Sequence, residues 1–217
     1  MYLTQRANNL KGRVTMPILF SIFIVFCLWF AIESSKHSKE SQQKYQDFLR
    51  REHEAALTRK KDISNIPKIK IPDDLPFKKS NDAYTNSIQN DIRKLQTKDI
   101  INFTGYTNTD LKLMYGAGHI NYLSECDNNF TKLAVSLNKW ATLLYKNNQI
   151  NDCKKVLEFA VSIDVDITNV YILLANIYIS ENKPAKINHL IRKASKLNST
   201  IKTNIVNQLN NLKSAHC

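Results

Sequence analysis

The sequence predicts an all-α protein with an N-terminal transmembrane helix, a polar helical stalk, and α-helical hairpin repeats closed by a C-terminal capping helix. Three observations lead to this prediction. The chain opens with a long uncharged run, apolar residues of its second half recur at helical spacing, and part of that half aligns with a later part of itself. These features divide the chain into segments 1–13, 14–32, 33–80, 81–132, 133–200 and 201–217.

The uncharged run extends from Val14 to Ile32. A helix of about 20 residues spans the roughly 30 Å hydrocarbon core of a bilayer, because it rises about 1.5 Å per residue. A cleaved signal peptide has a shorter apolar region of about 7–15 residues and a small-residue cleavage site. A core helix of a soluble domain would show a polar face, which this run lacks. We therefore expect a retained single-pass anchor after the short basic tail 1–13.

The orientation of this anchor depends on a small difference in flanking charge. The flanking basic residues are Arg6, Lys11 and Arg13 before the run, and Lys36, Lys39 and Lys44 after it. Only the second group is mixed with acidic residues, and Lys and Arg are enriched on the cytoplasmic side of membrane spans. We expect a cell-membrane protein with its tail inside and its folded domain outside the cytoplasm. The reverse orientation would suit a docking receptor that faces the cytoplasm.

Segment 33–80 begins with helix-forming polar residues and ends with prolines. Residues 38–61 contain no Gly or Pro, and their large apolar residues are too sparse for a coiled-coil seam. Pro67, Pro72 and Pro76 each push the preceding residue toward extended geometry. We predict a solvated helical stalk followed by a linker, or by an extended strap that lies on the domain.

Segment 81–132 predicts helices that lead into the repeats. Tyr84, Ile88, Ile92 and Leu95 lie on one apolar stripe at helical spacing. The sequence Thr107–Asp110 offers capping side chains for a second helix, and the glycines in 116–118 predict its end.

Segment 133–200 contains an internal repeat. One constant shift, which we call the repeat shift, aligns Trp140 with Leu174, Ala141 with Ala175, Asn148 with Asn182, Leu157 with Ile191, Ala160 with Ala194, and Ile163 with Leu197. A period of about 34 residues with two helices per period is typical of helical repeat proteins. The helical spacing of apolar residues in 201–217 predicts the capping helix.

This pattern resembles tetratricopeptide repeats (TPR), in which small residues let two helices approach and large residues fill the space between them. The first repeat matches the family's packing positions with Leu137, Trp140, Ala141, Leu144, Cys153, Leu157 and Ala160. The second repeat matches them with Tyr171, Leu174, Ala175, Tyr178, Ile187, Ile191 and Ala194. The departures from the family are Val165 and Ser199 for its closing proline, the bulky Ile187 for alanine, and Asn148 and Asn182 for its turn glycine. Asparagine can also adopt the left-handed geometry of such a turn.

The resemblance implies that the chain binds a protein or peptide in a groove lined by the first helix of each repeat. The family's groove positions fall on Val135, Asn138, Thr142, Tyr145 and Lys146 in the first repeat, and on Asn169, Ile172, Asn176, Ile179 and Ser180 in the second. The candidate groove residues among them are Asn138, Thr142, Tyr145, Lys146, Ile172, Asn176 and Ile179. Some relatives hold a terminal carboxylate with a Lys and Asn clamp, which this groove matches only in part because Ile172 replaces a polar residue. The resemblance thus implies a non-enzymatic, membrane-anchored scaffold or adaptor.

Charge suggests an alternative function. The chain carries a formal net charge of +12, and no acidic residue occurs after Glu181. The basic patch in this region consists of Lys186, Arg192, Lys193, Lys196 and Lys202. Such a surface attracts anionic lipid headgroups or cell-wall polymers, although excess charge also serves plain solubility. No nucleic-acid partner is expected, because no recognition motif accompanies the basic residues.

The sequence shows no residues arranged for catalysis, cofactor binding or metal binding. Its five histidines are scattered, and its four cysteines form neither a CxxC motif nor a Cys/His pattern of zinc spacing. We therefore expect free thiols, no cofactor and no enzymatic activity.

Overall fold

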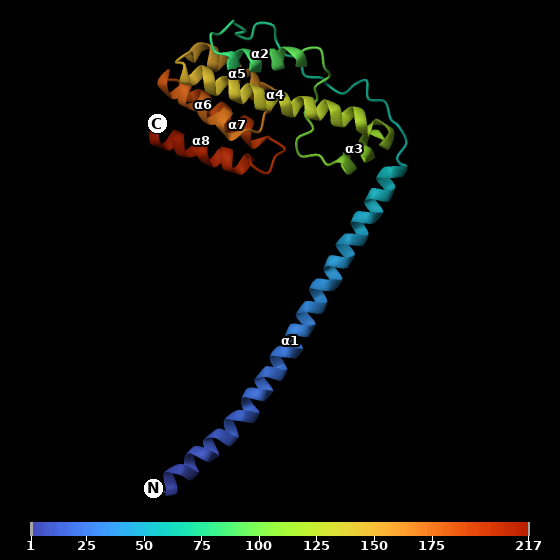
Figure 1. Ribbon diagram of the computed structural model, residues 1–217, viewed down its shortest axis with the longest axis vertical. Coiled ribbons are helices and arrows are strands. Elements are labelled where there is room, and N and C mark those ends of the chain that lie inside the picture. Colours follow the sequence, from blue (N-terminus) through green and yellow to red (C-terminus); the bar gives the residue numbers. More distant parts are fainter. Residues whose placement is uncertain (1, 217) are drawn as a thin grey trace. The chain divides into compact units, whose positions relative to one another are not determined.

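In the computed structural model the chain is helical (Figure 1), and the structure describes residues 2–216, with the side chains of residues 20–34, 36 and 39–215. The helices are α1 (Tyr2–Leu57), α2 (Ala83–Leu95), α3 (Asn108–Tyr115), the short 3₁₀ helix η1 (Ala117–His119), α4 (Ile120–Lys146), α5 (Ile150–Ser162), α6 (Thr168–Ser180), α7 (Ala185–Ser195) and α8 (Lys202–His216). No strand occurs within residues 2–216. The predicted all-α class is therefore confirmed. The chain divides into two compact units, with the boundary between Glu54 and Ala55.

The first unit consists of α1 alone. This helix continues from the apolar run into the polar segment, because no Gly or Pro occurs between residues 18 and 66. The large apolar side chains from Phe20 to Ile32 are 42% to 66% exposed. The helix is long and apolar enough to cross a membrane, and a signal sequence near an N-terminus would meet the same criterion.

The polar part of α1 is stabilised by ion pairs one turn apart. Lys44 Nζ lies 2.7 Å from Glu40 Oε1, and Arg50 Nη2 lies 3.1 Å from Asp47 Oδ1. Such exposed pairs contribute only about 0.3–0.5 kcal/mol each, so helix-forming residues and not charge are the main reason that this segment is helical. The helix ends at Leu57, ahead of the predicted end of the stalk at residue 61.

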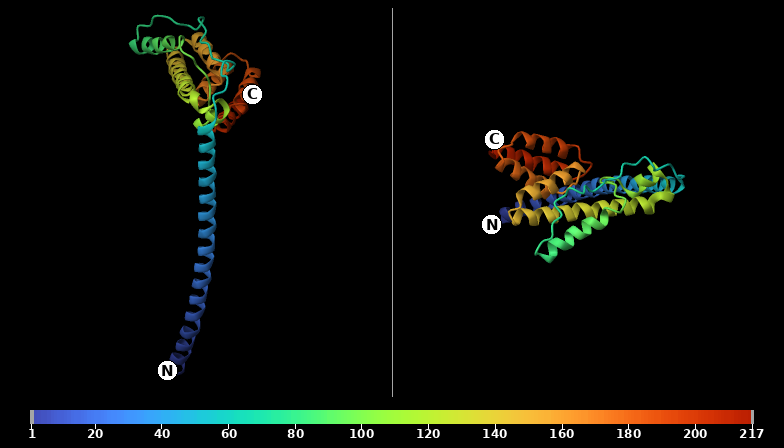
Figure 2. Two further views of the ribbon diagram at one scale, coloured as in Figure 1. Left: turned by 90° about the vertical axis from the view of Figure 1, so that its right-hand side faces the viewer. Right: turned by 90° about the horizontal axis from the view of Figure 1, so that it is seen from above.

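The second unit is a stack of helices in which neighbours along the chain pack together. The helix α4 lies between α2 and the later helices, as both views of Figure 2 show. The chain then pairs α4 with α5, α5 with α6, and α6 with both α7 and α8. One continuous hydrophobic core runs through these helices, and its largest fully buried side chains include Trp140, Tyr171 and Leu157.

The helix α4 crosses the boundary that the sequence analysis placed at residue 133. It runs without a break for 27 residues, because no Gly or Pro occurs between residues 119 and 183. Its first half packs on α3, where Leu123 and Cys126 join a second hydrophobic cluster with Leu111. The capping box predicted at the start of α3 is present, since Thr107 and Asp110 exchange hydrogen bonds.

The first helix of each repeat, α4 in the first and α6 in the second, ends in a turn of the same type. Asn148 and Asn182 occupy equivalent places in the repeats and have φ values of 56° and 55°. After each, the next backbone N–H donates to the carbonyl five positions earlier, from Gln149 to Leu144 (2.8 Å) and from Lys183 to Tyr178 (2.8 Å). This is the Schellman ending of an α-helix, which needs a left-handed residue. Both asparagines therefore do what the sequence analysis expected in place of glycine.

The proline-containing segment 58–82 forms an extended strap on the surface of the second unit. Its side chains Ile71 and Leu75 are buried in the main core. The ring of Phe77 stacks on Trp140, with 5.1 Å between the ring centroids, and the guanidinium of Arg93 lies 4.9 Å from the Phe77 ring. Phe77 thus links the strap to α2 and α4.

Two side-chain amides of α2 hold the backbone of the strap. Gln89 accepts from the N–H of Lys78 (3.0 Å) and donates to its carbonyl (2.9 Å). Asn86 accepts from the N–H of Ser80 (2.9 Å) and donates to its carbonyl (2.7 Å). Both strap peptides therefore have their polar groups paired although they lie outside any regular element. Gln89 is only 6% exposed, and these bonds explain a polar residue on the inner face of α2.

The start of the strap is fixed against Gly116. This glycine has a φ of 95°, and a Cβ atom there would collide with the backbone of Arg59. Two backbone hydrogen bonds join the same regions, from Lys61 N–H to Tyr115 O (3.0 Å) and from Ala117 N–H to Thr58 O (3.2 Å). Only glycine permits both the left-handed backbone and this close approach.

The strap contact predicts a measurable loss of stability. Replacing Phe77 with alanine removes its stacking on Trp140 and its contact with Arg93, and we expect the free energy of unfolding to fall by about 2 kcal/mol. The measurement is urea unfolding of the full chain in detergent, followed by Trp140 fluorescence in a Trp29→Phe background. The matched change is Tyr84→Ala. The sequence pattern predicts that Tyr84 shares the apolar stripe of α2, but its ring is exposed at the start of the helix, so its removal should cost less than about 0.5 kcal/mol. Equal losses in the two variants would contradict a stabilising strap.

Candidate functional site

The residues predicted to pack inside the repeats are buried. Of the fourteen packing positions from Leu137 to Ala194, thirteen are buried and only Ile191 is half-buried. Cys153 is fully buried, and its thiol donates to the carbonyl of Ala141 at 3.2 Å. Burial raises the pKa of this thiol to about 12, so it remains protonated at neutral pH and is not a nucleophile.

The seven predicted groove residues lie on α4 and α6, and we refer to them as the repeat face. They are Asn138, Thr142, Tyr145 and Lys146 on α4, and Ile172, Asn176 and Ile179 on α6. Tyr145 and Lys146 are exposed to solvent, and the side chains of the other five residues are half-buried. These side chains therefore remain accessible to solvent while their neighbours on the same helices form the core.

Asn169 connects the two helices at the repeat face. Its amide nitrogen donates to Asn138 Oδ1 at 2.8 Å and to Thr142 Oγ1 at 3.1 Å. The hydroxyl of Thr142 in turn donates to the backbone carbonyl of Asn138 at 2.8 Å. The structure thus joins three of the family's groove positions. Two of them belong to the seven candidate residues, and the third, Asn169, is the groove position that the repeat shift aligns with Val135.

The helix α8 continues the same arrangement beyond the second repeat. Ile205 and Leu209 are fully buried, and the repeat shift aligns them with Tyr171 and Ala175. The helix α8 packs on α6, and the repeat shift also aligns the half-buried Val206 with Ile172.

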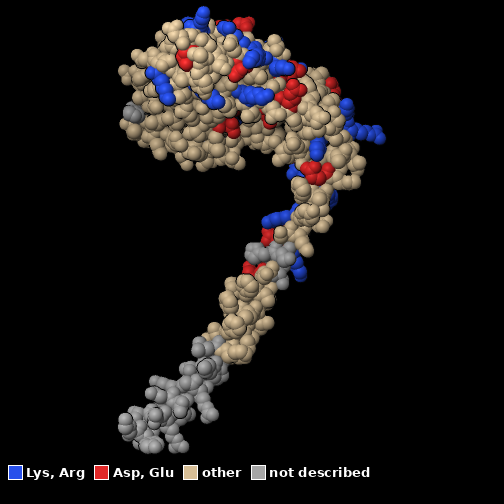
Figure 3. Space-filling model, in the orientation of Figure 1, with Lys and Arg blue, Asp and Glu red and all other residues tan. Residues whose placement is uncertain are grey.

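The basic patch predicted on the C-terminal helices is partly neutralised. Lys186 Nζ lies 3.7 Å from Glu158 Oε1, and Lys193 Nζ lies 3.1 Å from Asp164 Oδ1. Arg192, Lys196 and Lys202 are the exposed remainder. On the face of the molecule drawn in Figure 3, the surface over α8 is almost entirely without charged side chains. Two of the five residues of the predicted basic patch are therefore paired with acidic side chains.

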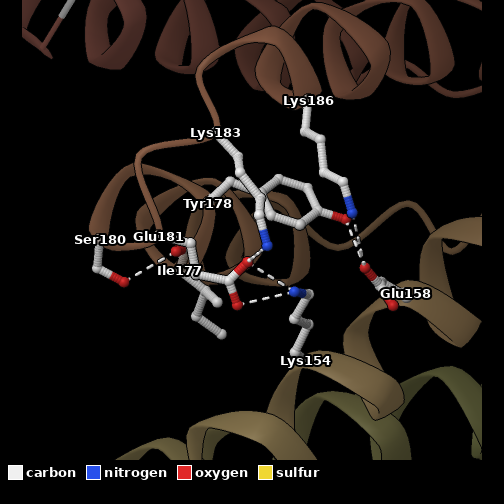
Figure 4. Close-up of polar contacts among 8 residues, drawn as sticks. All are labelled: Lys154, Glu158, Ile177, Tyr178, Ser180, Glu181, Lys183 and Lys186. Atoms are coloured by element: carbon white, nitrogen blue, oxygen red, sulfur yellow. Dashed lines mark hydrogen bonds and ion pairs between the residues drawn. The ribbon is translucent and has the colours of Figure 1, made fainter.

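A network of charged side chains joins α5 to the turn between α6 and α7 (Figure 4). Both carboxylate oxygens of Glu181 lie 2.7 Å from Lys154 Nζ, and one lies 2.8 Å from Lys183 Nζ. The hydrogen bonds from Lys154 and then Lys183 lower the pKa of Glu181 to about 2. Lys154 and Glu181 are only 18% and 22% exposed in their side chains, so this pair is shielded better than an ordinary surface ion pair.

Tyr178 completes this network. Its hydroxyl donates to Glu158 Oε1 at 2.8 Å, and the ammonium of Lys186 lies 4.8 Å from its ring centroid. Burial raises the pKa of Tyr178, and the hydrogen bond to Glu158 acts in the same direction. The hydroxyl of Tyr178 is therefore a neutral donor that lies between an acidic and a basic side chain.

Two buried polar atoms of the core have no hydrogen-bond partner among the described residues. They are the indole nitrogen of Trp140 and the hydroxyl of Tyr171. Leaving a buried donor without a partner costs about 1–3 kcal/mol of stability. The apolar area that the large rings of Trp140 and Tyr171 bury in the core offsets this cost.

The described residues contain no group of three His, Cys, Asp or Glu side chains placed to hold a metal ion. Cys27, Cys126 and Cys153 are free thiols. Comparisons with protein-family models, with curated proteins and with solved structures found no match to this chain.

The lowered pKa of Glu181 predicts an acid-sensitive contribution to stability. A carboxylate whose pKa falls from 4.5 to about 2 on folding stabilises the fold above pH ~4.5 and loses this effect as the pH falls toward ~2. We expect Glu181→Gln to lower the midpoint of thermal unfolding at pH 7, with a difference from the unaltered chain that disappears toward pH ~2. Asp91→Asn is the control, because Asp91 pairs with Lys94 on an exposed surface. A difference for Glu181→Gln that does not change with pH would contradict this assignment.

Proposed function

We propose that this chain is a membrane-anchored, TPR-like adaptor that binds another protein or a peptide on its repeat face. The observation that carries the proposal is the division of α4 and α6 into a buried side and an accessible side. The accessible side combines an exposed aromatic ring, Tyr145, with the accessible apolar residues Ile172 and Ile179. Aromatic and aliphatic anchors beside polar side chains are typical of surfaces that bind other proteins.

The polar part of the repeat face suits an extended peptide. Asn138, Thr142 and Asn169 form a hydrogen-bonded row across α4 and α6. Because amide and hydroxyl groups both donate and accept, such a row can exchange an internal hydrogen bond for one to a peptide backbone. Lys146 adds a positive charge at the end of α4. These features support a peptide partner more than a small-molecule substrate.

The exposed apolar part of α1 supports the membrane anchor. The large apolar side chains between Phe20 and Ile32 are exposed to solvent in the isolated chain, and water is an unfavourable surrounding for a continuous apolar surface of this kind. A bilayer removes this cost and would hold the second unit near the membrane. A retained anchor is therefore part of the proposal.

The alternative function, charge-driven binding of anionic lipid or wall polymer, has less support. Two of the five residues of the basic patch are paired with acidic residues of α5 and of the turn after it. An ion-paired lysine attracts an anion less strongly, because the neighbouring carboxylate offsets its field. Salt separates the two functions, since charge-driven binding weakens steeply with ionic strength and apolar binding does not.

The adaptor proposal predicts crosslinks that depend on position. With a photoreactive phenylalanine derivative in place of Tyr145, we expect a discrete adduct in cells and in membranes washed with about 0.5 M salt. The control positions are Lys155, exposed on α5, and Lys196, in the basic patch. Adducts in equal yield at positions 145 and 155 would contradict the proposal that the repeat face binds a partner. Adducts only at 196, removed by salt, would establish the charge-driven alternative.

The proposed location outside the cytoplasm has its own test. Cys126 and Cys153 are buried, and Cys217, which lies outside the described residues, is replaced by serine. Ser87 on α2 is accessible to solvent, so a Ser87→Cys change supplies a reactive thiol on the domain. We expect a membrane-impermeant maleimide to label this thiol in intact cells, with the same variant lacking Ser87→Cys as the control. Labelling only after lysis would place the domain in the cytoplasm.

A further inference from the structure

A groove lies between α2 and the middle of α4, and none of its lining residues belongs to the seven of the repeat face. Its volume is about 460 Å³, and its walls include Leu95 and Lys98 on the α2 side and Lys132 and Val135 on the α4 side. Neither the strap nor another helix contributes to its lining. The groove is therefore a concave surface of the second unit, on the side of α4 that packs on α2.

The floor of this groove is apolar and recessed. Leu95 is 8% exposed, whereas Val135 is 40% exposed, which is high for an aliphatic side chain in the middle of a long helix. Thr131 and Ser136 add hydroxyl groups along the same wall. A floor of this kind accepts an apolar side chain, while the hydroxyls can bond to the chain that carries it.

The rim of the groove is basic. Three lysines, Lys94, Lys98 and Lys132, surround the floor together with the single acid Asp91. Lys94 is paired with Asp91 at 3.0 Å, and neither Lys98 nor Lys132 has an ion pair within the described residues. The groove thus carries two uncompensated positive charges, and it favours a ligand with negative charge on either side of an apolar group.

We propose that the groove between α2 and α4 binds an acidic peptide segment that carries an apolar side chain. The apolar side chain enters between Leu95 and Val135, and the carboxylates on either side of it contact Lys98 and Lys132. A flat anionic membrane fits the same charges less well, because Leu95 is only 8% exposed and offers a bilayer little apolar surface. The lining residues of the groove include none of the seven of the repeat face, so this inference does not depend on the proposed adaptor function.

The test uses the full chain in uncharged detergent and a fluorescent peptide of one leucine flanked on each side by two glutamates. Binding is followed by fluorescence anisotropy. We expect the double change Lys98→Glu and Lys132→Glu to weaken binding about tenfold or more, because two attractive contacts become repulsive. The matched change Lys196→Glu and Lys202→Glu gives the same net charge elsewhere and should alter binding less than about twofold.

Two further comparisons decide whether the groove itself is used. A peptide with serine in place of leucine should bind about tenfold more weakly, since it leaves the apolar floor unfilled. The Tyr145→Ala change on the repeat face should have no effect. Equal weakening by both lysine pairs, or equal binding of the serine peptide, would overturn the proposal. So would binding to vesicles of anionic lipid that depends on Lys98 and Lys132 in the absence of peptide binding.

Discussion

The close approach of α4 and α5 is the constraint on which the second unit depends. Cys153 and Ala141 are both fully buried, and the thiol of one lies 3.2 Å from the carbonyl of the other. A contact this short requires small side chains on both helices, and it leaves the large rings of Trp140 and Tyr171 to fill the space on either side. The same alternation of small and large residues recurs along α6. The order of helices in the stack follows from it.

The strap adds a second constraint, which acts on the backbone. An extended segment has no internal hydrogen bonds, so its polar groups must find partners on the surface that it covers. Gln89 and Asn86 supply these partners, and Phe77 supplies apolar contact with Trp140. The residues just after α1 are therefore part of the folded domain and not a loose connection.

Because the inner sides of the helices form the core, the side chains that a partner could contact lie on the outer sides. The two surfaces described above differ in character. The repeat face joins amides and hydroxyls to aliphatic side chains, whereas the groove between α2 and α4 joins an apolar floor to unpaired lysines. The network of charged side chains around Glu181 belongs to neither surface, because its lysines and carboxylate form ion pairs with one another. One small domain thus presents two surfaces of different chemistry to possible partners.

The sequence by itself determined the helical class, the apolar N-terminal helix, the packing residues from Leu137 to Ala194, and the left-handed turns at Asn148 and Asn182. These features are local or periodic, so spacing and residue size are enough to reveal them. Only the tertiary structure decided that α4 runs through residue 133, that Lys186 and Lys193 have acidic partners, and that Leu95 and Val135 line one groove. These facts depend on which distant residues meet, and no pattern along one chain encodes a distance between two helices.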